Sequence, residues 1–173
     1  MEFFDVVRSR HSVRLFKEKE IEKKKLMEIL DAANKAPSAG NLQGYEIVVV
    51  KDYKTKANLS KAAFDQEFIA QAPVVLVFFA NQKKSSWRYG ERGKELYSIQ
   101  DATIAASYAQ LATTAVGLAS VWVGGFYEEE VKSLLKAQKE TKPIAIIPIG
   151  YADEKPEATP RREISDVAHE EQL

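Results

Sequence analysis

A continuous apolar run occupies the middle of the chain from Pro73 to Ala80 (PVVLVFFA). It is rich in β-branched and aromatic residues and shows no polar alternation, which predicts a strand buried on both faces. Three further segments have the same character and predict three more buried strands, at residues 45–51 (YEIVVVK), 120–123 (SVWV) and 143–149 (PIAIIPI). Helical patterns separate them. Four buried strands that alternate with helices predict an α/β layered domain.

The helical patterns cover residues 2–8, 21–35, 54–64, 93–116 and 128–138. The longest of them contains a stretch, residues 102–112, that is apolar and small-sided almost all round, so we expect it to be buried centrally or at a subunit interface. After Gly150 comes a polar tail of more than twenty residues. A tail of that length must pack on something or be disordered.

Composition excludes several classes of protein. The 173 residues carry 25 basic and 25 acidic side chains, two histidines and no cysteine. Zero net charge gives no global attraction to nucleic acid or to an anionic membrane. Without cysteine there is no disulfide, thiolate metal site or cysteine nucleophile, and we expect no metal. No apolar run is long enough to cross a bilayer, and the first residues lack a signal-peptide core, so the expected location is the cytoplasm.

Two clusters have polar side chains that packing does not require. In Arg10-His11-Ser12-Val13-Arg14 the side chains at 10, 12 and 14 would point the same way from an extended segment and could converge on one anion. The alternative is a surface loop that happens to be basic. The second cluster is residues 36–43 (APSAGNLQ), where Asn41 and Gln43 would face together and could match the edge of a heteroaromatic ring. The alternative is a helix stop followed by a turn.

Two further clusters lie toward the C-terminus. Gly124-Gly125, after a predicted strand, would let the backbone approach a flat ligand closely, or would simply form a tight turn. Arg161-Arg162 in the tail could clamp a phosphate or could be solvated. Motifs for a dinucleotide-binding Rossmann site, a P-loop and a serine nucleophile elbow are all absent. We therefore expect any reaction to belong to a cofactor.

The order and spacing of these four clusters, with Ile149-Gly150-Tyr151 at the end of the last strand, closely resemble the nitroreductase-like family of FMN flavoproteins. The resemblance covers essentially the whole chain as a single domain. It implies an α+β fold, an α/β/α sandwich with a mixed central sheet. It also implies an intertwined homodimer with two FMN sites at its interface, and a tail (residues 151–173) that wraps the partner.

The resemblance also implies site residues. Arg10, Ser12 and one of the two tail arginines would hold the FMN phosphate, and Arg14 would lie near the N1/O2 edge of the ring. A backbone amide of Gly124 or Gly125 would meet flavin N5. The full set implied for the cofactor is Arg10, His11, Ser12, Arg14, Pro37, Ser38, Ala39, Asn41, Gln43, Gly124, Gly125, Arg161 and Arg162.

The implied activity is an FMN-dependent NAD(P)H oxidoreductase that works by ping-pong hydride transfer to a nitroaromatic, quinone or flavin acceptor. The alternative is a flavin- or nucleotide-binding carrier or regulatory dimer without turnover. The chain departs from the family pattern at Gly44-Tyr45, where many relatives have Pro-Trp. The segment 81–92 is short, which predicts an open site, and its Arg88 and Arg92 could attract nicotinamide phosphates or merely be solvated.

Overall fold

The structure, a computed structural model, describes residues 1–173 and is built around one sheet. Its strands are β1 (Tyr45–Val50), β2 (Val74–Asn81), β3 (Ala119–Ser120) and β4 (Thr141–Gly150). They are ordered β1-β2-β4-β3, and each neighbouring pair is antiparallel. The sheet is therefore antiparallel and not mixed as expected, and the one parallel contact is an isolated bridge between Ser12 and Ser120 of β3.

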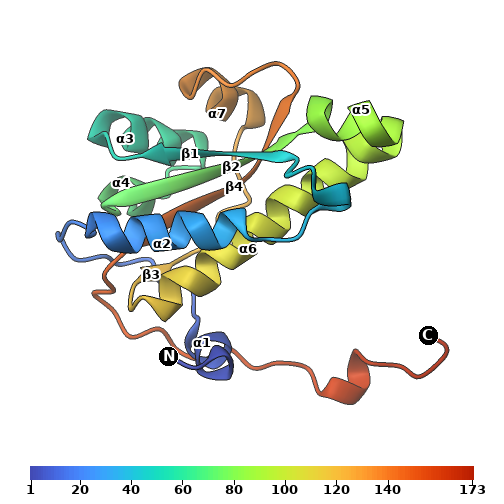
Figure 1. Ribbon diagram of the computed structural model, residues 1–173. Coiled ribbons are helices and arrows are strands. Elements are labelled where there is room, and N and C mark those ends of the chain that lie inside the picture. The colour runs from blue at the N-terminus through green and yellow to red at the C-terminus, as the bar shows by residue number, and fades with distance from the viewer.

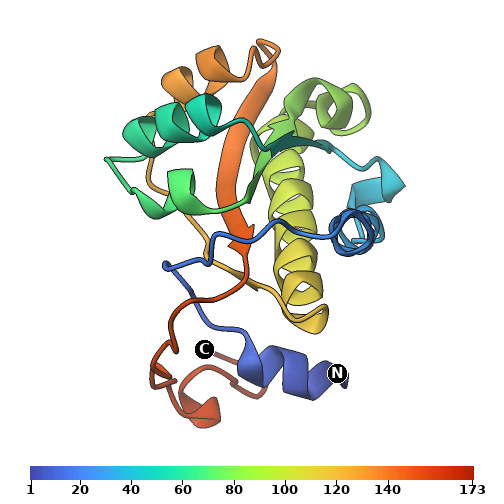
Figure 2. The ribbon, with the colours of Figure 1, turned by 90° about the vertical axis from the view of Figure 1, so that its left-hand side faces the viewer.

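Helices cover both faces of this sheet, as Figure 1 shows. One face carries α2 (Lys23–Asn34) and α6 (Ser98–Ala115), and the other carries α3 (Tyr53–Ala62), α4 (Phe68–Gln71) and α7 (Glu128–Leu134). At one end of the molecule, α1 (Phe3–Ser9) lies beside the C-terminal tail (Figure 2). At the other end is α5 (Gln82–Arg92). None of these helices combines the length and the apolar character needed to cross a bilayer.

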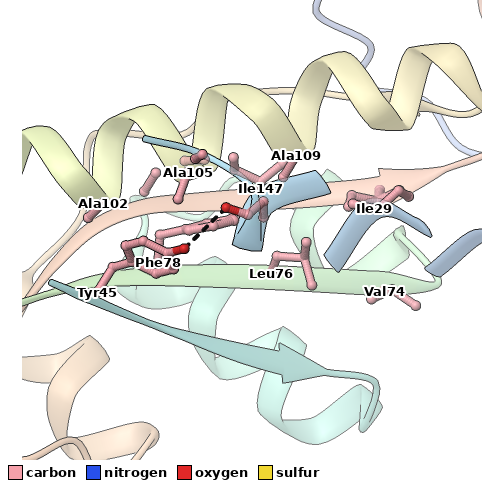
Figure 3. Close-up of a cluster of buried hydrophobic side chains, with 14 of the residues drawn as sticks. Ile29, Tyr45, Val74, Leu76, Phe78, Ala102, Ala105, Ala109 and Ile147 are labelled. Carbon is pink, nitrogen blue, oxygen red and sulfur yellow. Dashed lines mark hydrogen bonds between the residues drawn. The ribbon is translucent and has the colours of Figure 1, made fainter. Parts of the chain in front are cut away.

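Two hydrophobic cores follow from the alternation of side chains along β2. Leu76 and Phe78 point toward α2 and α6, whereas Val75 and Val77 point toward α3, α4 and α7. On the first side the sheet meets a row of small residues on α6, which Figure 3 shows at Ala102, Ala105 and Ala109. Small side chains let the helix axis approach the sheet closely, so α6 is fixed firmly across it.

The expected sandwich and most of the predicted elements are confirmed, but the short helix α4 was not predicted, the helix predicted at 128–138 ends at Leu134, and other elements differ in detail. The predicted strand at residues 120–123 pairs only at Ala119–Ser120, and then again at a single bridge between Val123 and Ile146. The long helix begins at Ser98, after a π-helical turn at Gly93–Tyr97. Helix α5 was not predicted because its sequence, QKKSSWRYGER, has few apolar residues to mark a face.

Candidate functional site

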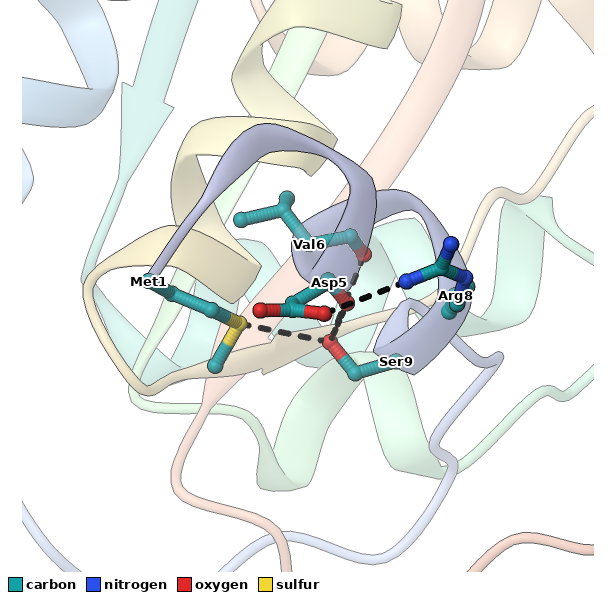
Figure 4. A network of polar contacts seen from close by, with 5 residues as sticks. All are labelled: Met1, Asp5, Val6, Arg8 and Ser9. Atoms are coloured by element: carbon teal, nitrogen blue, oxygen red, sulfur yellow. Dashed lines mark hydrogen bonds and ion pairs between the residues drawn. The ribbon is translucent and has the colours of Figure 1, made fainter.

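Helix α1 ends where the first basic cluster begins. The Ser9 hydroxyl donates to the Asp5 carbonyl at 2.6 Å, and Arg8 pairs with the Asp5 carboxylate at 3.3 Å (Figure 4). Arg10 then has extended backbone angles (φ −68°, ψ 111°). The chain therefore leaves the helix at Arg10, and the following residues run as an extended segment.

Neighbouring elements hold this extended segment on both sides. Val13 N donates to the Ser120 carbonyl at 3.1 Å, beside the parallel bridge to β3. From the tail, the Glu154 carboxylate accepts hydrogen bonds from the backbone amides of Arg14 and of Leu15. The segment is thus fixed between β3 and the start of the tail.

A cavity of about 540 Å³ opens between the segment and the tail. Its lining is entirely polar apart from one proline: Arg10, His11, Ser12, Arg14, Glu154, Pro156, Glu157, Thr159 and Arg161. The structure thus brings together the whole polar part of the first predicted cluster with Arg161 from the fourth. Arg162 does not line the cavity.

The cavity has an excess of positive charge, three guanidinium groups against two carboxylates. None of the three arginines forms an ion pair within the chain, since every salt bridge of the protein involves other residues. Glu154 is turned to backbone amides instead of to an arginine. Unpaired guanidinium forks at one cavity are suited to an oxyanion such as phosphate.

The second predicted cluster lies at another cavity, of about 590 Å³. Pro37, Ser38 and Ala39 line it together with Tyr97, Ile99, Gln100, Asp101, Thr103 and Ile104. Asn41 and Gln43 do not. The carboxamide of Gln43 donates to Asn41 Oδ1 at 2.8 Å and to the Asn41 carbonyl, so the two polar side chains face together as predicted but bind each other.

The loop that carries these residues, Ser38–Gly44, follows a tight path. Gly40, Asn41 and Gln43 all have left-handed backbone angles, with φ of 55°, 57° and 46°. The Ser38 hydroxyl accepts a hydrogen bond from Gln43 N at 2.9 Å across the loop. Because non-glycine residues seldom adopt this conformation, the surroundings must hold the loop in place.

Helices α5 and α6 supply that support. Asp101, in the first turn of α6, accepts from Ala39 N at 2.9 Å and from Gly44 N at 3.2 Å. From α5, Arg88 donates weakly to the Gly40 carbonyl at 3.4 Å. Arg92 donates to the Tyr97 hydroxyl at 3.0 Å, so both arginines of segment 81–92 are exposed residues that each make one hydrogen bond within the chain.

Burial affects one titratable group next to this loop. Tyr45 begins β1 and its hydroxyl donates to the Ala33 carbonyl at 3.2 Å, inside the core that Figure 3 shows. Burial raises the pKa of the Tyr45 hydroxyl, and the nearby Asp101 carboxylate raises it further. Tyr45 therefore stays a neutral hydrogen-bond donor that ties β1 to α2.

The glycine pair lies apart from both cavities. Gly124 and Gly125 are exposed and follow the bridge at Val123. The edge of the Phe64 ring lies about 3.3 Å from where a side chain on Gly125 would begin, and Phe64 meets Tyr127 edge to face at 4.9 Å. The predicted clusters thus lie at three places in one chain: the arginine cavity, the cavity of Pro37–Ala39, and the exposed glycine pair. The Ser12–Ser120 bridge joins the first place to β3, and Asp101 joins the second to α6.

Sequence reasoning missed three residues of these places. Asp101 is the only charged residue of α6 and is almost fully buried, and a single carboxylate in a helix of small and uncharged residues was a signal in the sequence. Phe64 and Glu154 carried no such signal. The left-handed turn at Phe64 and Asp65, and the return of the tail to residues 14 and 15, depend on tertiary contacts.

The fold and the cavity define a three-layer α+β protein with a cationic cavity near its N-terminal helix. A profile of the nitroreductase family matches residues 7–67 and 60–151. A relative named NADH dehydrogenase, from Thermus thermophilus, is 32% identical in an alignment 173 positions long, which covers 84% of this chain and 84% of the relative. These matches show that the chain belongs to the nitroreductase family.

Solved structures agree. An FMN-dependent nitroreductase from Clostridium difficile has a TM-score of 0.82 at 31% identity, covering 98% of this chain and 99% of the other. An NADPH:FMN oxidoreductase from Vibrio harveyi, complexed with NAD+, has a TM-score of 0.91 at 26% identity, covering 99% of this chain and 77% of the other. The expected fold is confirmed by these likenesses.

Proposed function

We propose that this protein is an FMN-dependent NAD(P)H oxidoreductase that passes electrons to small planar acceptors. The observation that carries the proposal is the cavity of Arg10, His11, Ser12, Arg14 and Arg161, which suits one phosphate group. The names of the matched structures from Clostridium difficile and Vibrio harveyi support FMN as the ligand that bears this phosphate.

The residues present fit such a group. Guanidinium forks can bind two phosphate oxygens each, and a serine hydroxyl adds a further donor. No set of three or more histidine or carboxylate side chains is placed to hold a metal ion, so the donors available are those for an anion. FMN, when bound, supplies a ring that accepts a hydride from NAD(P)H and returns the electrons to an acceptor.

The chain's own residues have separate tasks in this proposal. Arg10, Ser12 and Arg161 hold the phosphate, with His11 beside them. Arg14 stabilises the negative charge that hydride transfer brings to the N1/O2 edge of the ring, as donors stabilise a developing oxyanion. The loop residues Pro37, Ser38, Ala39, Asn41 and Gln43 line the ring or ribityl chain, and an amide of Gly124 or Gly125 meets N5.

We also propose that each site is completed by a second copy of the chain. The arginine cavity and the cavity of Pro37–Ala39 share no lining residue. A two-fold dimer can bring the loop of one chain to the cavity of the other. The exposed apolar side chains of α1 and the exposed tail, residues 153–173, would pack in such an interface, with the tail wrapping the partner.

The acceptor in this proposal is a nitroaromatic, a quinone or a free flavin. The exposed aromatic edges of Phe64 and Tyr127 beside Gly125 support a planar acceptor, because offset or edge-on contacts of rings favour flat partners. The proposal places the enzyme in the cytoplasm, where reduced nicotinamide cofactors are supplied.

Visible spectroscopy tests the proposal. Purified protein reconstituted with FMN should show the flavin absorption band at about 450 nm after gel filtration. NADH or NADPH should bleach that band without oxygen, and a quinone or nitroaromatic compound should restore it. Protein that retains no flavin would contradict the family function, and retained flavin that never bleaches would indicate the non-catalytic carrier instead.

A further inference from the structure

The Ser38–Gly44 loop is connected to α6 by one buried side chain. Asp101 is only 2% exposed, and each of its carboxylate oxygens accepts one hydrogen bond from the loop. The donors are Ala39 N at 2.9 Å and Gly44 N at 3.2 Å, which lie near the two ends of the loop. A single rigid carboxylate therefore sets the distance between these ends.

The packing around this carboxylate leaves no room for adjustment. A Cβ atom on Gly44 would overlap Ser85 Oγ and would lie 2.8 Å from Asp101 Oδ2. Ser85 Oγ is the one buried side-chain polar atom of the chain that has no hydrogen-bond partner. The backbone at Gly44 is thus enclosed by α5 on one side and by α6 on the other, and a side chain there would force Ser85 or Asp101 to move.

The conformation of the loop requires such a support. Three of its residues, Gly40, Asn41 and Gln43, are in the left-handed region, which is sparsely populated for side-chain-bearing residues. The hydrogen bond from Gln43 N to the Ser38 hydroxyl closes the loop internally, but nothing in that bond ties the loop to the sandwich. The Asp101 carboxylate connects both ends of the loop to α6, beside the backbone bond from Asn81 N to the Gly44 carbonyl at 2.8 Å and the longer contact from Arg88 to the Gly40 carbonyl.

We propose that Asp101 is the positioning residue for the flavin-contacting loop. It acts through the amides of Ala39 and Gly44, to which its two carboxylate oxygens are committed. This inference rests on the proposed function, because the loop is proposed to line the FMN ring or ribityl chain. Because the loop is preformed, FMN binding has a lower conformational cost. Loss of the carboxylate should therefore reduce the affinity for FMN more than it reduces the stability of the fold.

The central test is Asp101→Asn. This substitution keeps the shape of the side chain but replaces one acceptor oxygen with an NH2 group, which then faces a backbone N–H donor. Thr113→Val is a matched control, since Thr113 is buried on the same helix and its hydroxyl donates only to the Ala109 carbonyl within α6. FMN binding to each apoprotein is followed by quenching of flavin fluorescence, and thermal unfolding of the apoproteins is measured in parallel.

We expect FMN affinity to fall roughly 10- to 100-fold in Asp101→Asn, as lost hydrogen bonds to a charged group typically cause. The absorption bands of any flavin that still binds should shift, because the ring contacts a displaced loop. Thr113→Val should bind FMN as the wild type does. Equal losses in both variants, or unchanged affinity and spectrum in Asp101→Asn, would overturn the positioning role.

A measurement on the wild-type apoprotein needs no variant. The amide hydrogens of Ala39 and Gly44 should exchange with solvent more slowly than the exposed amides of the tail, and free exchange at both would also overturn the inference. Failure of the two proposals can be told apart. Wild-type protein that binds no FMN would remove the proposed function and this inference with it, whereas tight wild-type binding with an unaffected Asp101→Asn variant would remove this inference alone.

Discussion

Arg161 and Arg162 are adjacent and chemically identical, yet the structure separates their surroundings. Arg161 lines the cavity with Arg10 and Arg14, and Arg162 does not. Antiparallel contacts at the start of the tail bring it toward this cavity, since Lys17 N donates to the Tyr151 carbonyl at 2.9 Å and Asp153 N to the Leu15 carbonyl at 2.8 Å. The tail is therefore aligned beside the first basic cluster before it reaches Arg161.

This difference predicts unequal effects of two alanine substitutions. Arg161→Ala removes a guanidinium group from the cavity and should weaken FMN binding roughly tenfold or more. Arg162→Ala removes the same charge from a neighbouring position outside the cavity and should change the affinity far less. Fluorescence titration of the two apoproteins with FMN compares them directly. Equal losses would mean that net charge matters and not the cavity.

The composition of the site could be predicted further than its geometry. Arg10, Ser12 and Arg14 were expected to converge because an extended segment alternates its side chains, and they do line one cavity. Asn41 and Gln43 were expected to face together, and they do, but the left-handed backbone and the hydrogen bond between the two side chains were not expected. Local alternation is readable from sequence, whereas positive φ angles outside glycine depend on tertiary support.

At the scale of elements, segments with a strong apolar pattern were predicted correctly and a segment without one was missed. The apolar run at residues 73–80 became β2 because both of its faces are buried, one in each core. Helix α5 was missed because tertiary contacts to the loop and to Tyr97 stabilise it in place of an apolar face. The layers could thus be predicted from the sequence, whereas the contacts at Gly40 and Asp101 that shape the site depend on tertiary structure.

Helix α3 illustrates how one cap stabilises an element and makes it respond to pH. Asp52 is its N-cap, and its carboxylate accepts from Thr55 N and from the Thr55 hydroxyl, both at 2.8 Å. These hydrogen bonds lower the pKa of Asp52 from its ordinary value of 3.8. Because the folded-state pKa is the lower one, the ionised cap stabilises the fold above the ordinary value, and this contribution is lost as the pH falls through the folded-state pKa.

Two substitutions at this cap separate shape from charge. Asp52→Ala removes the acceptor and should lower Tm by roughly 2–4 °C at neutral pH. Asp52→Asn keeps an acceptor oxygen without the charge, so its Tm should lie closer to that of the wild type. The gap between wild type and Asp52→Asn should narrow when the melts are repeated at about pH 3. A gap that stays constant with pH would show that the charge of Asp52 contributes nothing.

At the scale of the whole molecule, two features lie exposed on the surface: the apolar side chains of α1 and the C-terminal tail. Four apolar residues in and before α1 are exposed, at 69% for Met1, 63% for Phe3, 68% for Phe4 and 46% for Val7, and only Val6 of that helix is buried. The tail passes beside α1 and extends away from the sandwich, as Figures 1 and 2 show. Clustered apolar exposure of this kind marks an interaction surface, and the proposed occupant is a second copy of the chain.

Dimer formation and FMN binding should therefore be lost together. Phe4→Glu places a charge in the apolar surface of α1, and we expect the dissociation constant of the dimer to rise at least about tenfold. Tyr53→Glu is the matched control, because Tyr53 is an aromatic residue of similar exposure, 71%, at the start of α3 on the opposite side of the sheet. Sedimentation velocity gives the assembly state of each variant, and FMN titration at several protein concentrations gives its affinity.

If each site needs two chains, FMN affinity in Phe4→Glu should recover as the protein concentration rises, while wild type and Tyr53→Glu bind FMN equally at all concentrations tested. Two separate cavities in one chain, with no lining residue in common, are the physical reason for this coupling. A wild-type monomer that binds one FMN tightly would contradict it, because the arginine cavity and the Ser38–Gly44 loop would then have to serve one cofactor from places that a single chain keeps apart.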